Sequence, residues 1–523
     1  MSAVRCVTTI AFASCAGDGS LATIRPSVAS ASTSASCVAT GSASGVAFPA
    51  LMNWSAVPGV LRDQLDQAVR EGGEQQLARP DARLHGHNDE MADQPPRHRV
   101  QRVKSAGPDD VLEHVGPGTD IIVPLANGEP VTLLDALERH ADRLEGVRVH
   151  QMHVLHDRPY LHGAFGDRLR HVSYFLSHVT RPCFREGTVD LVPNNFSEMR
   201  AILKSATVDP LVLAAASPPD RHGYFSLGVN ADYVASFIGR ARFFIEANAQ
   251  MPRTFGRNQV HVSQVEGWVD ADHPLVEVPP APVRPEDRAI AGHVAERIPN
   301  GATLQTGIGS IPNAILSALS GHEDLGVHTE LLSDGVMDLV EAGVVTGVRK
   351  ELNRNKTVGT FALGTRRLYD FLDENSAFEM WPVRYVNDPR VIAQESNFVS
   401  INATLAVDLI GQCASETLGG TYYSSSGGQA DFARGAMYSP GGQGFVVLHS
   451  TARGGTISKI VPQLPAGDVV TTLKNTVDKV VTEWGVAELR GRSIRQRATS
   501  LIAIAHPDHR DHLTSEAKRL HLL

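Results

Sequence analysis

No stretch of this 523-residue sequence contains eighteen consecutive apolar residues, and no dense block of lysine and arginine occurs in it. A membrane-spanning helix needs about 20 apolar residues in a row, so no transmembrane segment is predicted. Lys and Arg number 48 against 57 Asp and Glu, which gives a net charge of −9. A nucleic-acid partner is therefore not expected.

Cysteine is also scarce. The five cysteines are Cys6, Cys15, Cys37, Cys183 and Cys413. A disulfide framework or a zinc site needs cysteines in close pairs, and this odd set has no such spacing. Free thiols in a reducing compartment are predicted.

Histidines repeat at every third position from His150 to His156 and again from His506 to His512. Residues three apart on a strand face opposite sides, and no cysteine or carboxylate completes a coordination set, so no metal site is predicted. The sequence also lacks a Gly-x-Ser-x-Gly nucleophile elbow, which argues against a hydrolase with an activated serine.

The first 107 residues differ in composition from the rest. Ala, Ser, Thr and Gly dominate residues 1 to about 50, and residues 71–107 are polar and rich in proline. Neither part can bury enough apolar surface to offset the entropy of ordering, so residues 1–107 are predicted to be a disordered tail. The tail weakly resembles an organelle transit peptide, and a misplaced start is an equal alternative. A cytoplasmic protein is expected, with organelle import left open.

From residue 108 to residue 275, short β-branched runs alternate with helical periods, which predicts an α/β domain with a mostly parallel sheet. Strands are expected at 120–125, 147–155, 189–193, 210–217 and 242–248, and a helix at 131–144. Residues 276–285 contain four prolines. Because proline is excluded from helix interiors and central strands, this segment is predicted to be a linker.

A second α/β domain is predicted over residues 286–523 by the same alternation. Strands are expected at 303–306, 327–332, 357–363, 398–408, 444–450 and 480–483, and helices at 288–298, 311–319, 335–341 and 365–374. The expected fold class is thus two open α/β domains with mostly parallel sheets, preceded by a disordered tail.

Two glycine-rich segments precede predicted helices. Gly307 and Gly309 permit a tight strand-to-helix turn, at which a helix N-terminus favours an anion such as a phosphate. Their spacing matches neither the dinucleotide fingerprint nor a P-loop, so a turn that binds nothing stays an alternative. Gly427 and Gly428 could point backbone N–H groups at a developing oxyanion. The alternative there is an ordinary loop in which Asp431 caps the helix.

A single carboxylate, Glu330, is predicted to lie inside an apolar strand over 327–332. A carboxylate in a dry environment is either a structural liability or a reagent. Pairing with an arginine would be the structural explanation. We favour a chemical role, because the glycine turn at Gly307 lies about twenty residues upstream.

Eight motifs in the same order resemble those of the acetyl-CoA hydrolase/transferase group of class I CoA-transferases. The segments are Ser217–Gly228, Asn248–Gly256, Thr306–Pro312, Val327–Gly335, Ser400–Gln412, Gly427–Arg434, Ser458–Pro462 and Val480–Leu489. The likeness runs from about residue 120 to residue 512 and is closest to the 4-hydroxybutyrate and butyrate:acetate CoA-transferases. Each motif is modest, but eight in this order are specific.

The resemblance implies two α/β domains with the active site between them. It further implies that Glu330 is the nucleophile and that the backbone of Gly427 and Gly428 forms the oxyanion site. The residues expected near coenzyme A are Gly307, Ile308, Gly309, Lys459 and Ile460.

The expected activity is transfer of CoA between short carboxylic acids, such as 4-hydroxybutyrate or butyrate with acetate, through a glutamyl-CoA thioester. Coenzyme A is then a substrate, and no permanently bound cofactor is expected. A carboxylate needs no general base if it is ionised at neutral pH, which is the expectation for Glu330. A homo-oligomer, dimer or tetramer, is expected. The alternatives are an acetyl-CoA hydrolase that uses the same glutamate and a catalytically silent acyl-CoA-binding protein.

Overall fold

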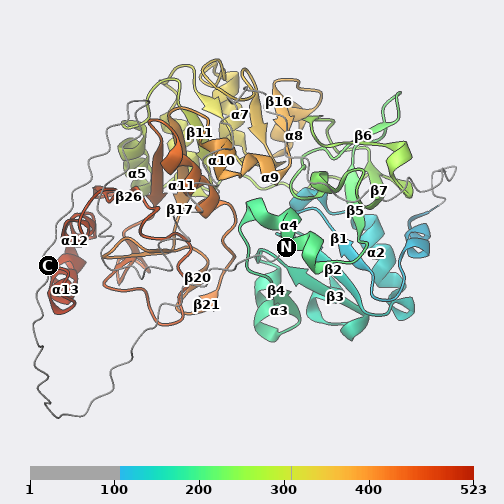
Figure 1. Ribbon diagram of the computed structural model, residues 1–523, viewed down its shortest axis with the longest axis horizontal. Coiled ribbons are helices and arrows are strands. Elements are labelled where there is room, and N and C mark those ends of the chain that lie inside the picture. Colours follow the sequence, from blue (N-terminus) through green and yellow to red (C-terminus); the bar gives the residue numbers. More distant parts are fainter. Residues whose placement is uncertain (1–106, 308) are drawn as a thin grey trace, which may run out of the picture. The chain divides into compact units, whose positions relative to one another are not determined.

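A computed structural model describes residues 107–307 and 309–523 (Figure 1). Two large, mostly parallel β-sheets form the framework of this part of the chain. These residues belong to one compact unit. The predictions made for residues 1–106 and for Ile308 lie outside the described residues. Mostly parallel sheets flanked by helices confirm the predicted fold class, whereas the domain boundaries stay a prediction.

The first sheet has seven strands in the order β10-β7-β5-β1-β2-β3-β4, and all of its neighbours are parallel. The bounds are β1 (Asp120–Ile122), β2 (Val147–Gln151), β3 (Leu169–Ser173), β4 (Val189–Leu191), β5 (Leu211–Ala216), β7 (Arg242–Asn248) and β10 (Gly267–Ala271). The connecting helices include α2 (Val131–Arg139), α3 (Thr180–Glu186) and α4 (Met199–Ala206). Because the strands are parallel, their carboxyl ends meet at one edge.

Strand β5 shows why this sheet is buried on both faces. All six of its residues are buried, and residues 211–213 alternate between two apolar clusters, whereas residues 214–216 all belong to the cluster of Val212. Val212 packs in one cluster and Leu213 in the other. A continuous apolar run of this kind is typical of a central parallel strand covered by helices on both sides.

The second sheet has six strands in the order β12-β11-β17-β22-β26-β27, parallel except for the last pair. The bounds are β11 (Thr303–Thr306), β12 (Gly326–Val327), β17 (Phe398–Ala403), β22 (Gln443–Val447), β26 (Lys479–Thr482) and β27 (Gly485–Glu488). Helices of this half include α5 (Pro285–Ala295), α6 (Ser310–Ala318), α7 (Asp334–Glu341), α8 (Arg366–Leu372), α9 (Val383–Val386), α10 (Pro389–Ile392), α11 (Gln429–Tyr438), α12 (Ile494–Ala503) and α13 (Pro507–Arg519).

The prediction of one continuous strand over residues 327–332 is wrong. The chain leaves the six-stranded sheet after β12, and residues 331–332 form β13, which pairs with β15 (Phe361–Ala362) in a separate sheet. The run is extended on both sides of Glu330, but its hydrogen-bonding partner changes there. Hydrophobic periodicity detects extended backbone and cannot show which sheet it joins.

Two other predicted strands divide for the same reason. The run at 357–363 becomes β14 (Thr357–Gly359) and β15, and the run at 398–408 becomes β17 and β18 (Ala406–Asp408). The smaller strands are β6 (Tyr224–Ser226), β9 (Gln259–His261), β19 (Cys413–Ala414), β20 (Thr417–Leu418), β21 (Thr421–Tyr422), β23 (Thr451–Ala452), β24 (Ile457–Ser458) and β25 (Ile460–Val461).

A small sheet joins the two halves of the chain. Strand β8 (Phe255–Gly256) comes from the first half and pairs with β16 (Phe378–Met380), which in turn pairs with β14. A Cβ atom on Gly256 would lie 2.3 Å from the main-chain oxygen of Met380, so the close strand approach requires glycine there. The predicted linker includes Pro285, but Pro285 is the first residue of α5. The first position of a helix tolerates proline.

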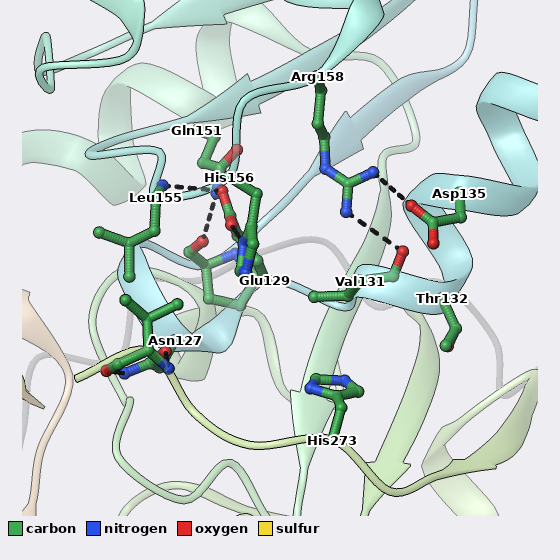
Figure 2. A network of polar contacts seen from close by, with 12 residues as sticks. Asn127, Glu129, Val131, Thr132, Asp135, Gln151, Leu155, His156, Arg158 and His273 are labelled. Atoms are coloured by element: carbon green, nitrogen blue, oxygen red, sulfur yellow. Dashed lines mark hydrogen bonds and ion pairs between the residues drawn. The ribbon is translucent and has the colours of Figure 1, made fainter.

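A polar network at the carboxyl edge of the seven-stranded sheet secures the loops after β1 and β2 (Figure 2). The buried carboxylate of Glu129 accepts hydrogen bonds from Gln151 Nε2 at 2.8 Å, from Leu155 N at 3.3 Å and from His156 Nδ1. Nearby, Arg158 donates to Asp135 at 2.7 Å and so ties the loop to α2. A carboxylate with this many donors holds backbone in place.

The histidines of the first triplet contact different partners. His150 Nε2 lies 3.1 Å from Asp120, whereas His156 contacts Glu129. Within residues 107–307 and 309–523, no group of three His, Cys, Asp or Glu is arranged to hold a metal ion. Likewise, no helix in the described part of the chain has the length and apolar character needed to cross a membrane.

Candidate active site

Glu330 lies where the chain passes from the six-stranded sheet to the small β13–β15 sheet. Its main-chain oxygen accepts hydrogen bonds from Thr360 N at 3.1 Å and Phe361 N at 3.0 Å. The residue therefore follows the carboxyl end of β12, at the sheet edge where parallel α/β folds place their ligand sites.

The two residues before Glu330, His328 and Thr329, fix the backbone there through contacts with two different segments. The Thr329 hydroxyl contacts the main chain of Thr306, with 3.3 Å to the oxygen and 3.4 Å to the nitrogen. The His328 ring nitrogen Nε2 lies 2.8 Å from the main-chain oxygen of Val386. Burial lowers the pKa of His328 to about 3, so this histidine stays neutral and acts as a structural donor.

Among the residues that the structure describes, one side chain donates a hydrogen bond to the carboxyl group of Glu330. Asn387 Nδ2 donates to Oε2 at 2.8 Å, and no Lys, Arg or His of the described residues forms an ion pair with it. Although Glu330 retains some exposed surface, burial of its carboxyl group raises the pKa to about 7, and the Asn387 bond opposes this. The structural explanation for Glu330, an ion pair with an arginine, is therefore wrong for the residues that the structure describes. With a pKa of about 7, the carboxyl group of Glu330 differs from the expected carboxylate that is fully ionised at neutral pH.

Gly428 is in direct contact with this carboxyl group. A Cβ atom built on Gly428 would lie 2.0 Å from Glu330 Oε2 and 2.2 Å from Asn387 Nδ2. The residue precedes α11, and a helix N-terminus stabilises negative charge. Residues 330 and 428, almost a hundred positions apart in the sequence, are therefore adjacent in the fold.

Gly427 and Asp431 contact the other half of the chain. A Cβ atom on Gly427 would lie 3.3 Å from Phe175 Cε2, and the main-chain oxygen of Gly427 accepts from Phe196 N at 3.0 Å. The alternative in which Asp431 caps its own helix is wrong, because its carboxylate accepts from Ser197 instead.

The glycine turn after β11 is adjacent to the same edge. Gly307 N donates to the main-chain oxygen of Ile401 at 2.9 Å, and Gly309, with φ +132°, precedes α6. The contacts between Thr306 and Thr329 connect this turn to the residue before Glu330. The turn is therefore one of the loops at the carboxyl edge of the six-stranded sheet.

Lys459 and Ile460 lie further along that edge. Lys459 N donates to Ser450 O at 2.9 Å, and Ser450 follows β22. Burial lowers the pKa of the Lys459 amine, and the charge of Glu483 opposes the shift. Ile460 is fully buried in an apolar cluster, and among the described residues no hydrogen bond or ion pair links Lys459 to Glu330.

Sequence reasoning missed Asn387, Phe175 and Ser197. Asn387 follows the four-residue helix α9, Phe175 lies in the loop after β3, and Ser197 lies in a short 3-10 helix after β4. No local pattern marks such residues, because their contacts with the site arise only from long-range folding. A polar residue in a short break between helices is the one weak signal for Asn387.

Family models match both halves of the chain. The acetyl-CoA hydrolase/transferase N-terminal domain matches residues 91–279, and the C-terminal domain matches residues 364–517. A succinyl-CoA:cyclohexane-1-carboxylate CoA transferase of Geobacter metallireducens is 45% identical over 420 residues, which cover 80% of this chain and 96% of that protein. The chain belongs to the acetyl-CoA hydrolase/transferase family.

Further relatives agree with this membership. A 4-hydroxybutyrate coenzyme A transferase of Clostridium kluyveri is 42% identical over 401 residues, covering 76% of this chain and 94% of that protein. The crystal structure of RipA from Yersinia pestis has a TM-score of 0.77 at 39% identity and covers 80% of this chain and 97% of that one. The resemblance inferred from the eight motifs is confirmed, and this family member is an enzyme of the CoA-transferase type.

The raised pKa of Glu330 has a consequence for stability. Because the pKa rises from 4.5 to about 7, the folded state keeps a proton that the unfolded state has lost. That contribution is complete below pH 4.5 and disappears as the pH rises through about 7. Glu330→Gln buries no charge, so its free energy of unfolding should exceed that of the unmodified protein by about 2–3 kcal/mol at pH 8. Denaturant unfolding should show no gain at pH 4; an equal gain at both pH values would contradict the shift.

Asn387 should govern the ionisation of Glu330. Its hydrogen bond lowers the pKa of Glu330, so Asn387→Ala should raise the apparent pKa of the acid limb of any activity that needs the Glu330 carboxylate. The exposed amide of Gln394, close in sequence, gives the control Gln394→Ala. Rates measured from pH 5 to pH 9 test this, and an unmoved acid limb in Asn387→Ala would disprove it.

Proposed function

We propose that this protein transfers CoA between short carboxylic acids through a thioester formed on Glu330. The observation that carries the proposal is the contact of an unpaired glutamate carboxyl with Gly428 at the start of α11. A carboxylate without a cationic partner keeps its lone pairs available for attack.

In the proposed reaction, a Glu330 carboxylate oxygen attacks the thioester carbonyl carbon, the C–S bond breaks, and a mixed anhydride and CoA thiolate form. The thiolate then attacks the glutamyl carbonyl carbon, which releases the first acid as its carboxylate and leaves a glutamyl-CoA thioester. An acceptor carboxylate repeats the two steps in reverse and regenerates Glu330. Every step exchanges one acyl bond for another, so the energy of the thioester is retained.

The remaining candidate residues would serve this chemistry. Backbone N–H groups of Gly427 and Gly428 would stabilise the oxyanion that forms on the attacked carbonyl, an effect worth roughly 10²–10³ in rate. The turn of Gly307, Ile308 and Gly309, together with Lys459 and Ile460, would contact coenzyme A. The names of the two related transferases above support acyl-CoA and a short or cyclic carboxylic acid as the substrate classes.

Trapping the thioester tests the proposal. Incubation with acetyl-CoA followed by borohydride should reduce the glutamyl thioester to a primary alcohol, detected by mass spectrometry on the peptide that contains Glu330. Glu330→Gln should give no such product. An unmodified Glu330 peptide in the active protein would refute the proposal and favour a silent acyl-CoA-binding protein. Loss of acetyl-CoA at the same rate with and without acceptor acids would indicate hydrolysis instead.

The pH dependence of transfer follows from the pKa of Glu330. Attack requires the carboxylate, so kcat/KM should rise with pH and level off above an apparent pKa of about 7. An ordinary, solvent-exposed glutamate would give a limb near pH 4.3. Initial rates across pH 5 to pH 9 with a fixed acyl-CoA measure the limb. A profile that is flat over this range would show that the ionisation of Glu330 does not limit the reaction.

A further inference from the structure

The first turn of α11 is held in place by the first half of the chain. A short 3-10 helix, η7 (Phe196–Glu198), donates three hydrogen bonds to this turn and to Gly427, which precedes it. Phe196 N donates to Gly427 O at 3.0 Å, and Ser197 donates to Asp431, from its main-chain nitrogen at 3.0 Å and from its hydroxyl at 2.8 Å. These bonds hold both the start of the glycine pair and the residue one helical turn beyond it.

A carboxylate at position 431 is energetically unfavourable, because burial destabilises its charged form. Asp431 is only 5% exposed, and burial raises its pKa to about 7. The two Ser197 bonds oppose the shift, whereas the negative charges of Glu330 and Glu198 add to it. A second buried carboxyl beside Glu330 destabilises the fold, because like charges share one poorly hydrated region.

The geometry of the glycine pair shows what the proposed oxyanion site requires. Gly428 touches the Glu330 carboxyl so closely that a single added carbon atom would overlap it. Backbone donors that stabilise an oxyanion must be aimed at the attacked carbonyl within a fraction of an ångström to be effective. The loop that carries Gly427 and Gly428 is fixed by α11 at one end and by η7 at the other.

We infer that Ser197 and Asp431 are positioning residues, and that their contact holds Gly427 and Gly428 against the carboxyl group of Glu330. No hydrogen bond links Asp431 to Glu330 among the described residues, so Asp431 acts through the loop and through its charge. The inference rests on the proposed function, since it assigns the two residues a part in the transfer reaction at that same site.

Two variants separate the positional effect from the electrostatic effect. Ser197→Ala removes the hydroxyl bond and should lower kcat for CoA transfer about tenfold while leaving KM for acyl-CoA unchanged, because a hydrogen bond to a charged group is lost. Ser197→Thr keeps the hydroxyl and should restore the rate. Ser205→Ala, an exposed serine of α4 in the same half, is the matched control and should behave as the unmodified protein.

Asp431→Asn keeps the shape of the side chain and removes its charge. The titratable groups that face this carboxyl are Glu330 and Glu198, and loss of the Asp431 charge makes ionisation of Glu330 easier. The acid limb of the rate profile should therefore move to lower pH in Asp431→Asn and stay in place in Ser205→Ala. A purely structural role would lower the rate without moving the limb.

Hydrogen exchange of the peptide that spans residues 424–438 provides a measurement independent of activity. Exchange at Gly427 and Gly428 should be faster in Ser197→Ala than in the unmodified protein and in Ser205→Ala. Unchanged exchange, or faster exchange with an unchanged kcat, would overturn the inference. An unmodified protein that transfers no CoA would instead disprove the proposed function, and the exchange rates would still decide whether Ser197 holds the loop.

Discussion

Replacing Glu330 should abolish CoA transfer and leave the fold intact. Glu330→Gln keeps the size of the side chain but cannot form the acyl bond, so the rate should fall by roughly 10⁴-fold or more. Glu330→Asp should also fail, since removal of one methylene moves the carboxylate by about 1.5 Å from its attack position. Exposed Glu323, in the segment before β12, supplies the control Glu323→Gln.

The measurement is the rate of CoA transfer from acetyl-CoA to added carboxylic acids, with circular dichroism to confirm folding. Retained turnover in Glu330→Gln would refute the assignment of the nucleophile. A loss of equal size in Glu323→Gln would show that the assay responds to general damage.

Gly428→Ala should be nearly as harmful, for a steric reason. The added methyl group would lie 2.0 Å from Glu330 Oε2 and 2.2 Å from Asn387 Nδ2, well inside van der Waals contact. Either the carboxyl group or the start of α11 must move, so the attack geometry is lost. Because correctly aimed backbone donors are worth roughly 10²–10³ in rate, we expect a decrease in kcat of at least this size.

The control is Gly292→Ala in α5, where an added methyl group meets nothing within 4 Å. That change should leave the rate unaltered and raise stability by up to about 1 kcal/mol, as alanine favours helices over glycine. Normal kcat in Gly428→Ala would mean that the contact with Glu330 is not part of the reactive arrangement.

The sequence predicted those parts of the fold that follow from local periodicity. The bounds of β7 (Arg242–Asn248) and β11 (Thr303–Thr306) agree with the predicted strands. The apolar run 243–245 marks β7, and the glycine turn at Gly307 limits β11. The change of sheet at Glu330 could not be predicted. It depends on pairing of residues 331–332 with residues 361–362, a long-range contact that leaves no periodic signal.

In the candidate site, too, some features could be predicted from sequence motifs and others could not. The proximity of Glu330 and Gly428 could be expected from motifs, and the structure brings these residues together. The donor Asn387 and the raised pKa of Glu330 could not be expected, because both depend on elements that pack around the carboxyl group from elsewhere in the chain. Burial of a particular atom is a tertiary property, whereas sequence patterns report which residues tend to be inside.

The shared strand pairing of β8 with β16 bears on any attempt to shorten this protein. A fragment of residues 286–523 would include all eight candidate residues and β14, yet it would lack β8, the second partner strand of β16, and the donors of Phe196 and Ser197. An unpaired strand edge favours aggregation. We therefore expect that the second half does not fold on its own and cannot serve as a minimal catalytic fragment.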